Sequence, residues 1–111
     1  MFNSRVEIKK ISPSKLQGAK VVEANNDKIH ITFDLIENLF NVNEGDKIEL
    51  YIDNKKPENI ESYDFCAHGY LVKPEDQAKI TILSLWGILF QFDPPIGLNY
   101  NEKYYLCLRK S

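Results

Sequence analysis

Short segments in which apolar and polar residues alternate do most to constrain the fold of this chain. In residues 28–34, KIHITFD, the side chains of Ile29, Ile31 and Phe33 fall on one side and the polar residues between them on the other. Residues 47–53, KIELYID, repeat this pattern. A period of two is typical of a strand with one buried face. About eight such segments, separated by turn-forming residues at intervals of about 8–12 residues, predict an all-β fold, an antiparallel barrel of about eight strands.

One segment has a different period and predicts the only helix. In residues 34–40, DLIENLF, the apolar residues Ile36, Leu39 and Phe40 are spaced as on one face of a short helix. Asp34 is suited to cap its first turn. We expect this helix to close one end of the barrel.

Two other segments predict local features of the backbone. Gly69 interrupts a strand-like run, which indicates a bulge or a sharp bend. Residues 74–78, PEDQA, predict a turn in which Glu75 and Asp76 are solvated.

Residues 80–92, ITILSLWGILFQF, contain no charged residue, although Asp, Glu, Lys and Arg make up 27% of the chain. Glycine readily adopts the positive φ that a tight turn needs. Trp86-Gly87 therefore predicts a β-hairpin with strands at about 80–85 and 88–92. The alternative is a single strand bent around Gly87.

Both faces of the predicted hairpin are apolar. Sequence parity assigns Ile80, Ile82, Trp86 and Ile88 to one face and Leu83, Leu85 and Leu89 to the other. A barrel wall buries one face only, and each large side chain left in water forgoes about 1.5–3 kcal/mol. A patch of this kind usually marks a partner surface, unless the helix or a loop covers it. We therefore select Tyr63, Trp86, Gly87 and Leu89 as candidate interface residues.

Length and charge limit the possible functions. The 111 residues predict a single domain spanning 1–111. The net charge is −2, and residues 21–108 hold seven basic against fifteen acidic side chains. Nucleic-acid binders usually have a basic excess, so this balance disfavours direct nucleic-acid binding. With no apolar run of membrane-spanning length and no secretory leader, we expect a cytoplasmic protein that does not bind a membrane.

The residues that could carry chemistry are few. Cys66 and Cys107 lie among apolar neighbours and lack a C-x-x-C spacing, which favours buried free thiols; a structural disulfide is the alternative. Cys66 and His68 share a strand face but have no second ligand pair, so no metal site is predicted. We expect no catalytic site, no cofactor and no small-molecule substrate. A stacking platform for bases, made of aromatic residues, is a competing possibility; its members would be Tyr51, Tyr63, Phe65 and Tyr70.

Five motifs in order then resemble one family, the eighth subunit of multisubunit DNA-directed RNA polymerases, which is called the G subunit in archaea. They are Thr32-Phe33-Asp34, Leu39-Phe40, Tyr63-Asp64-Phe65 followed by Gly69, Trp86-Gly87-Ile88-Leu89, and Tyr105-Leu106-Cys107-Leu108-Arg109. The similarity runs from about residue 5 to residue 110. Eukaryotic members have a long acidic insertion where this chain has only NKKPENIES, so the compact length is similar to that of the archaeal branch.

The resemblance implies an antiparallel barrel related to the oligonucleotide-binding (OB) fold. It also implies a non-catalytic accessory or assembly subunit that acts in transcription and docks on the largest polymerase subunit. A stand-alone barrel that binds single-stranded nucleic acid is the alternative, and fold alone does not decide between the two.

Overall fold

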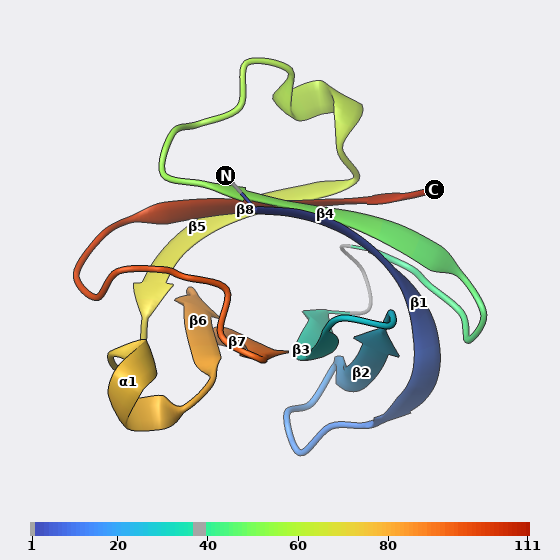
Figure 1. The fold of residues 1–111 in the computed structure, drawn as a ribbon. Coiled ribbons are helices and arrows are strands. Elements are labelled where there is room, and N and C mark those ends of the chain that lie inside the picture. Colours follow the sequence, from blue (N-terminus) through green and yellow to red (C-terminus); the bar gives the residue numbers. More distant parts are fainter. Residues whose placement is uncertain (1, 37–39) are drawn as a thin grey trace.

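Strands account for nearly all regular structure in the computed structural model, which describes residues 2–36 and 40–111. In chain order they are β1 (Phe2–Pro13), β2 (Ala19–Asn25), β3 (His30–Ile36), β4 (Lys47–Asp53), β5 (Phe65–Leu71), β6 (Thr81–Leu85), β7 (Ile88–Asp93) and β8 (Tyr104–Lys110). A 3₁₀ turn, η1 (Ile60–Ser62), precedes β5, and a single-turn helix, α1 (Glu75–Ala78), follows it (Figure 1).

The strands close into an antiparallel barrel in the order β1-β2-β3-β7-β6-β5-β8-β4, and β4 returns to β1. The long strand β1 pairs with β4 through its first half and with β2 through its second half, curving around the barrel (Figure 1). The β1–β2 register shifts between Ile8 and Lys10, and such irregularities bend strands. The predicted all-β, eight-stranded antiparallel barrel is confirmed, whereas its relation to the OB fold stays a prediction.

The core is formed by the alternate residues that the sequence pattern assigns to the interior. Ile31 and Phe33 of β3 are buried, and in β4 every second residue from Ile48 onward is fully buried. The rings of Phe33 and Phe90 stack with centroids 4.7 Å apart, joining β3 to β7. Each such side chain contributes about 1.5–3 kcal/mol by burial.

The predicted helix at 34–40 is wrong for its first residues. Asp34, Leu35 and Ile36 continue β3 and pair with β2 down to Ala19. A helix of about two turns is marginal alone, and the sheet provides these residues with backbone partners instead. Residues 37–39 lie outside the described residues.

A short helix, α1, forms where the sequence predicts a turn, and Glu75 is not simply solvated. Its carboxylate accepts hydrogen bonds from the hydroxyl of Thr81 and from the backbone N–H groups of Gly97 (3.2 Å) and Leu98 (3.0 Å). The Thr81 hydroxyl in turn accepts from the N–H of Ile96 at 2.9 Å. Glu75 therefore attaches the loop between β7 and β8 to α1, a contact that the local sequence does not reveal.

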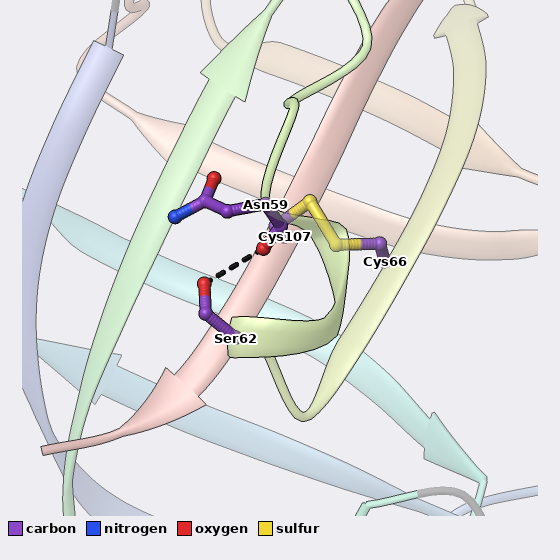
Figure 2. Close-up of a disulfide and its surroundings, with 4 residues drawn as sticks. All are labelled: Asn59, Ser62, Cys66 and Cys107. Atoms are coloured by element: carbon purple, nitrogen blue, oxygen red, sulfur yellow. Dashed lines mark hydrogen bonds between the residues drawn. A yellow bond between two sulfur atoms is a disulfide. The ribbon is translucent and has the colours of Figure 1, made fainter.

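The two cysteines form a disulfide, so the prediction of free thiols is wrong (Figure 2). Cys66 of β5 and Cys107 of β8 are directly opposite in register, with Cα atoms 4.2 Å apart. This spacing is that of a close cross-strand pair, which places the two sulfur atoms within bonding reach. The pairing depends on strands 41 residues apart in sequence, so spacing alone could not predict it.

Gly69 marks a bend in β5, as predicted. The strand pairs with β8 as far as Gly69 and with β6 from Tyr70 onward, and it is strongly curved (Figure 1). A Cβ atom at Gly69 would lie 1.8 Å from the carbonyl oxygen of Ser84. The close passage of β6 over this point therefore requires glycine.

Candidate interaction surface

The hairpin of β6 and β7 is confirmed, with Trp86 and Gly87 as its two turn residues. Their φ angles are +59° and +90°. Two successive positive φ values match the type I′ turn, whose twist suits a two-residue hairpin. The turn therefore holds Trp86 at the tip of a well-paired ribbon.

Trp86 is the most exposed large hydrophobic side chain among the described residues, with 81% of its surface accessible. Its ring packs edge-on against His68 at 5.6 Å, and His68 lies at the same distance from Tyr105. The three rings thus form a row across β6–β7, β5 and β8.

Further apolar surface adjoins this row on the same side of the barrel. Tyr70 is opposite Ser84 and is 49% exposed. Val72, also exposed, donates its N–H to the carbonyl of Ile82 at 2.9 Å. We call His68, Tyr70, Val72, Trp86 and Tyr105 the outer aromatic surface.

A shallow hollow of about 420 Å³ lies within the outer aromatic surface. Tyr70 and Trp86 line it together with Gly69, Ser84 and Gly87. Because Gly69 has no side chain, it contributes only backbone to the lining of this hollow.

The assignment of hairpin faces by sequence parity is partly wrong. Leu83 and Leu85 are buried, but Ile88 pairs with Leu85 and packs against the core, whereas Leu89 pairs with Ser84 on the outside. Across a two-residue turn, an odd-numbered residue of one strand lies on the same face as an even-numbered residue of the other. Odd and even numbers therefore do not assign faces to both strands of this hairpin. The outer face is also less exposed than expected, since Ile82 and Leu89 are half-buried.

The four candidate interface residues do not lie in one place. Trp86 and Gly87 form the turn, and Leu89 lies next to it, with its N–H 3.4 Å from the Asp34 carboxylate. Tyr63 follows η1 and contacts Tyr51 of β4 and Arg109 of β8. Its ring stacks on Tyr51 at 6.3 Å.

The proposed base-stacking platform does not assemble either. Tyr51 and Tyr63 stack on each other, but Phe65 packs against the core and Tyr70 is opposite Ser84 in the β5–β6 pair. His68 and Tyr105, which sequence reasoning did not select, are the residues that accompany Trp86. The contact between His68 and Tyr105 follows from the β5–β8 register, in which these two residues are directly opposite.

Two observations concern other classes of function. Among residues 2–36 and 40–111, no three side chains of His, Cys, Asp or Glu gather as metal ligands would. Over the same ranges, no helix is both long enough and apolar enough to cross a membrane.

Comparison with known proteins identifies the family. Residues 1–111 match the family of the G subunit of DNA-directed RNA polymerase, RpbG. The chain belongs to this family. It is 29% identical to DNA-directed RNA polymerase subunit Rpo8 of Sulfolobus acidocaldarius, over 99% of this chain and 98% of that protein. It is 25% identical to the subunit Rpo8 of Saccharolobus solfataricus, over 95% of this chain and 89% of that protein.

For this member of the RpbG family, the similarity extends over the whole barrel, so the predicted resemblance is confirmed. Membership of the RpbG family places the chain in transcription. It does not by itself say which face of the barrel meets other polymerase subunits.

Proposed function

We propose that this chain is a non-catalytic accessory subunit of DNA-directed RNA polymerase that docks on the largest subunit through its outer aromatic surface. The observation that carries the proposal is the 81% exposure of Trp86 at the tip of a type I′ turn. An exposed tryptophan forgoes the free energy of burial, which a partner restores on binding.

The geometry suits an interface of this kind. Tryptophan and tyrosine are enriched among residues that dominate binding energy, each costing about 2 kcal/mol or more when truncated. Because two paired strands hold the turn, little conformational freedom is lost on binding. The adjoining hollow over Gly69 provides shape for a partner side chain.

In this proposal the subunit acts by binding alone. Nucleotidyl transfer belongs to other chains of the polymerase, and nucleic acid is contacted only indirectly. The barrel contributes a rigid surface that supports the region of the largest subunit on which it docks. We place this assembly in the cytoplasm.

The test is reconstitution of the polymerase, or capture of the largest subunit, with the Trp86→Asp variant. Aspartate tolerates the positive φ of this turn position, so we expect a folded barrel whose affinity falls at least about thirtyfold, as loss of a 2 kcal/mol contact requires. Leu16→Asp is the matched control, because Leu16 is 53% exposed in the loop between β1 and β2. It should assemble normally.

Two results would count against this role. If Trp86→Asp is folded and still assembles with unchanged affinity, the outer aromatic surface is not the interface. If the wild-type chain alone binds single-stranded oligonucleotides with a steep salt dependence, the barrel has a nucleic-acid function of its own.

A further inference from the structure

The Cys66–Cys107 disulfide lies on the outer side of the barrel, where Cys66 is half-buried. In β8 the inward residues are Tyr104, Leu106 and Leu108, whereas Cys107 points outward. Cys107 is fully buried. Tyr63 of the loop of residues 54–64 stacks on Tyr51, which is opposite Cys107 in the β4–β8 pair, so this loop crosses the outer face at the disulfide. Figure 2 shows Asn59 and Ser62 of the loop among the surroundings of the disulfide.

None of residues 54–64 is buried, and the contacts of this loop include a hydrogen bond from the Asn54 amide to the Glu102 carboxylate at 3.3 Å. Its turn η1 contains no buried residue. The Tyr63 ring stacks on Tyr51, and the Arg109 guanidinium lies 5.4 Å from the centre of the Tyr63 ring. Arg109 also pairs with Glu49. Segments with little buried surface open at a small fraction of the free energy of global unfolding.

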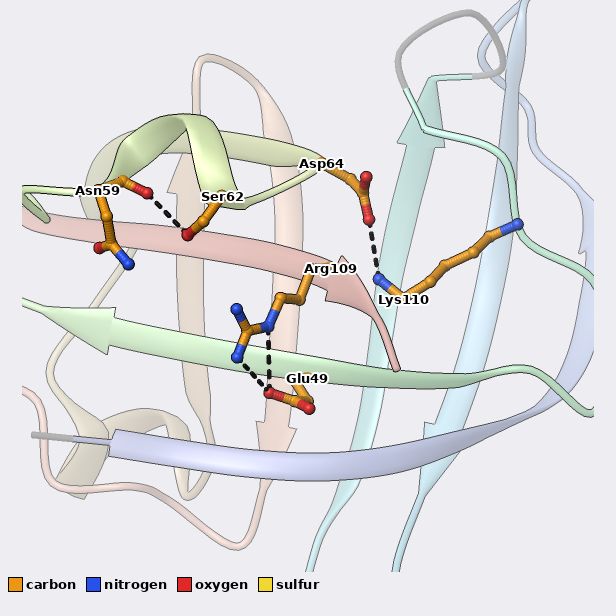
Figure 3. A network of polar contacts seen from close by, with 6 residues as sticks. All are labelled: Glu49, Asn59, Ser62, Asp64, Arg109 and Lys110. Atoms are coloured by element: carbon orange, nitrogen blue, oxygen red, sulfur yellow. Dashed lines mark hydrogen bonds and ion pairs between the residues drawn. The ribbon is translucent and has the colours of Figure 1, made fainter.

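The attachment at the end of the 54–64 loop is also polar. The Asp64 carboxylate accepts the backbone N–H of Lys110 at 2.8 Å (Figure 3). The Asp64 N–H donates to the carbonyl of Leu108 at 2.8 Å. These bonds extend the β5–β8 ladder up to the loop. Asp64 therefore stays attached to β8 when the rest of the loop moves away from the barrel.

The barrel itself does not need the sulfur bond to hold its strands in register. β5 and β8 pair from Phe65 to Gly69, and β8 also pairs with β4 from Tyr105 to Lys110. Reduction leaves these ladders in place. It replaces one bonded pair of sulfurs with two thiols in non-bonded contact, which need more room directly beneath the loop.

We propose that Cys66–Cys107 is a redox-active site whose reduction by a dithiol releases the 54–64 loop while the barrel stays folded. Cys66 is half-buried and Cys107 fully buried, so attack falls on Cys66 once the loop opens. This inference concerns β5, β8 and their covering loop, and it holds whether or not the chain docks as proposed.

The reaction is a two-electron exchange with a protein or small-molecule dithiol. A thiolate of the dithiol bonds to the Cys66 sulfur, the Cys66–Cys107 bond breaks, and Cys107 leaves as a thiolate that takes up a proton. The second thiol of the reductant then attacks its partner sulfur in the mixed disulfide and releases Cys66. The protein gains two electrons and two protons, and the dithiol becomes a disulfide.

The test is limited digestion of the full chain with a Glu-specific protease that has no disulfide of its own, with and without dithiothreitol. The 54–64 loop carries exposed Glu58 and Glu61, and exposed Glu44 lies in the loop before β4 as an internal control. We expect reduction to raise cleavage at Glu58 and Glu61 about tenfold, because cleavage follows the open population. Cleavage at Glu44 and the far-UV circular dichroism should not change.

A double variant, Cys66→Ala with Cys107→Ala, provides the matched control. With and without dithiothreitol, the loop of this variant should be cleaved as fast as the loop of the reduced wild-type protein. Reoxidation should restore protection of the loop only in the wild type. Three results would overturn the proposal: a disulfide that excess dithiothreitol leaves intact in the native protein, equal loop cleavage in both redox states, or faster cleavage at Glu44 together with loss of the dichroism signal.

Discussion

The carboxylate of Glu75 accepts a hydrogen bond from the backbone N–H of Leu98 at 3.0 Å, across 23 residues of sequence. The same carboxylate binds the hydroxyl of Thr81, which is fully buried. One side chain on a four-residue helix therefore positions the loop between β7 and β8. Its removal would leave the N–H groups of Gly97 and Leu98 and the proton of the Thr81 hydroxyl without the acceptor they have now.

We expect Glu75→Ala to lower the free energy of unfolding by about 2–4 kcal/mol, since each buried group left unsatisfied costs about 1–3 kcal/mol. Urea denaturation of the variant and the wild type would measure this difference in the free energy of unfolding. Asp76→Ala is the matched control, because Asp76 is exposed in the same helix, and its change should stay within about 0.5 kcal/mol. Equal effects of the two substitutions would show that the Glu75 contacts contribute little.

The close passage of β6 over Gly69 gives a second prediction. Gly69→Ala places a Cβ atom 1.8 Å from the Ser84 carbonyl oxygen, so β5 and β6 must separate, and we expect a loss of about 3 kcal/mol or more. Gly18→Ala is the comparison, because its Cβ meets nothing within 4 Å but φ is +79°. That change should cost only about 1–2 kcal/mol from backbone strain. Thermal unfolding of both variants would distinguish a steric clash from a conformational cost.

Tyr104 gives a prediction at alkaline pH. Burial raises the pKa of Tyr104 above its ordinary value of 10.0, and its hydroxyl accepts the N–H of Asn99 at 2.7 Å. Because the pKa of Tyr104 is higher in the folded state than in the unfolded state, the neutral Tyr104 stabilises the fold. This stabilisation is complete below about pH 10 and is lost as the pH rises through the folded-state pKa. We expect the free energy of unfolding to fall above pH 10.

The comparison for this effect is Tyr104→Phe, followed by urea denaturation from pH 8 to pH 11. The variant should be less stable at pH 8 by about 1 kcal/mol, the value of one hydrogen bond, and should lose less stability than wild type at alkaline pH. A parallel decline in both proteins would assign the alkaline effect to other groups.

Much of the fold could be predicted because it depends on neighbouring residues. The alternation in residues 28–34 and 47–53 identified the inward faces of β3 and β4, and Trp86-Gly87 identified the hairpin turn. The helix predicted at 34–40 is wrong for residues 34–36, because pairing with β2 extends β3 through Ile36. A two-turn helical pattern carries too little free energy to resist that pairing.

The candidate surface was predicted less completely. Trp86 was identified from its turn position, but His68 and Tyr105 were not, since their contact depends on the register of strands distant in sequence. The faces of Ile88 and Leu89 were exchanged because the two-residue turn reverses parity.

By itself, the sequence determined the class of fold, the number of strands and the hairpin that presents Trp86, because these depend on the period of apolar residues and on turn chemistry within a few positions. Only the tertiary structure decided that Cys66 bonds to Cys107, that Glu75 holds Leu98, and that His68 joins Trp86 to Tyr105. Each of these contacts depends on how the barrel closes, and closure brings together residues whose separation along the chain carries no local signal.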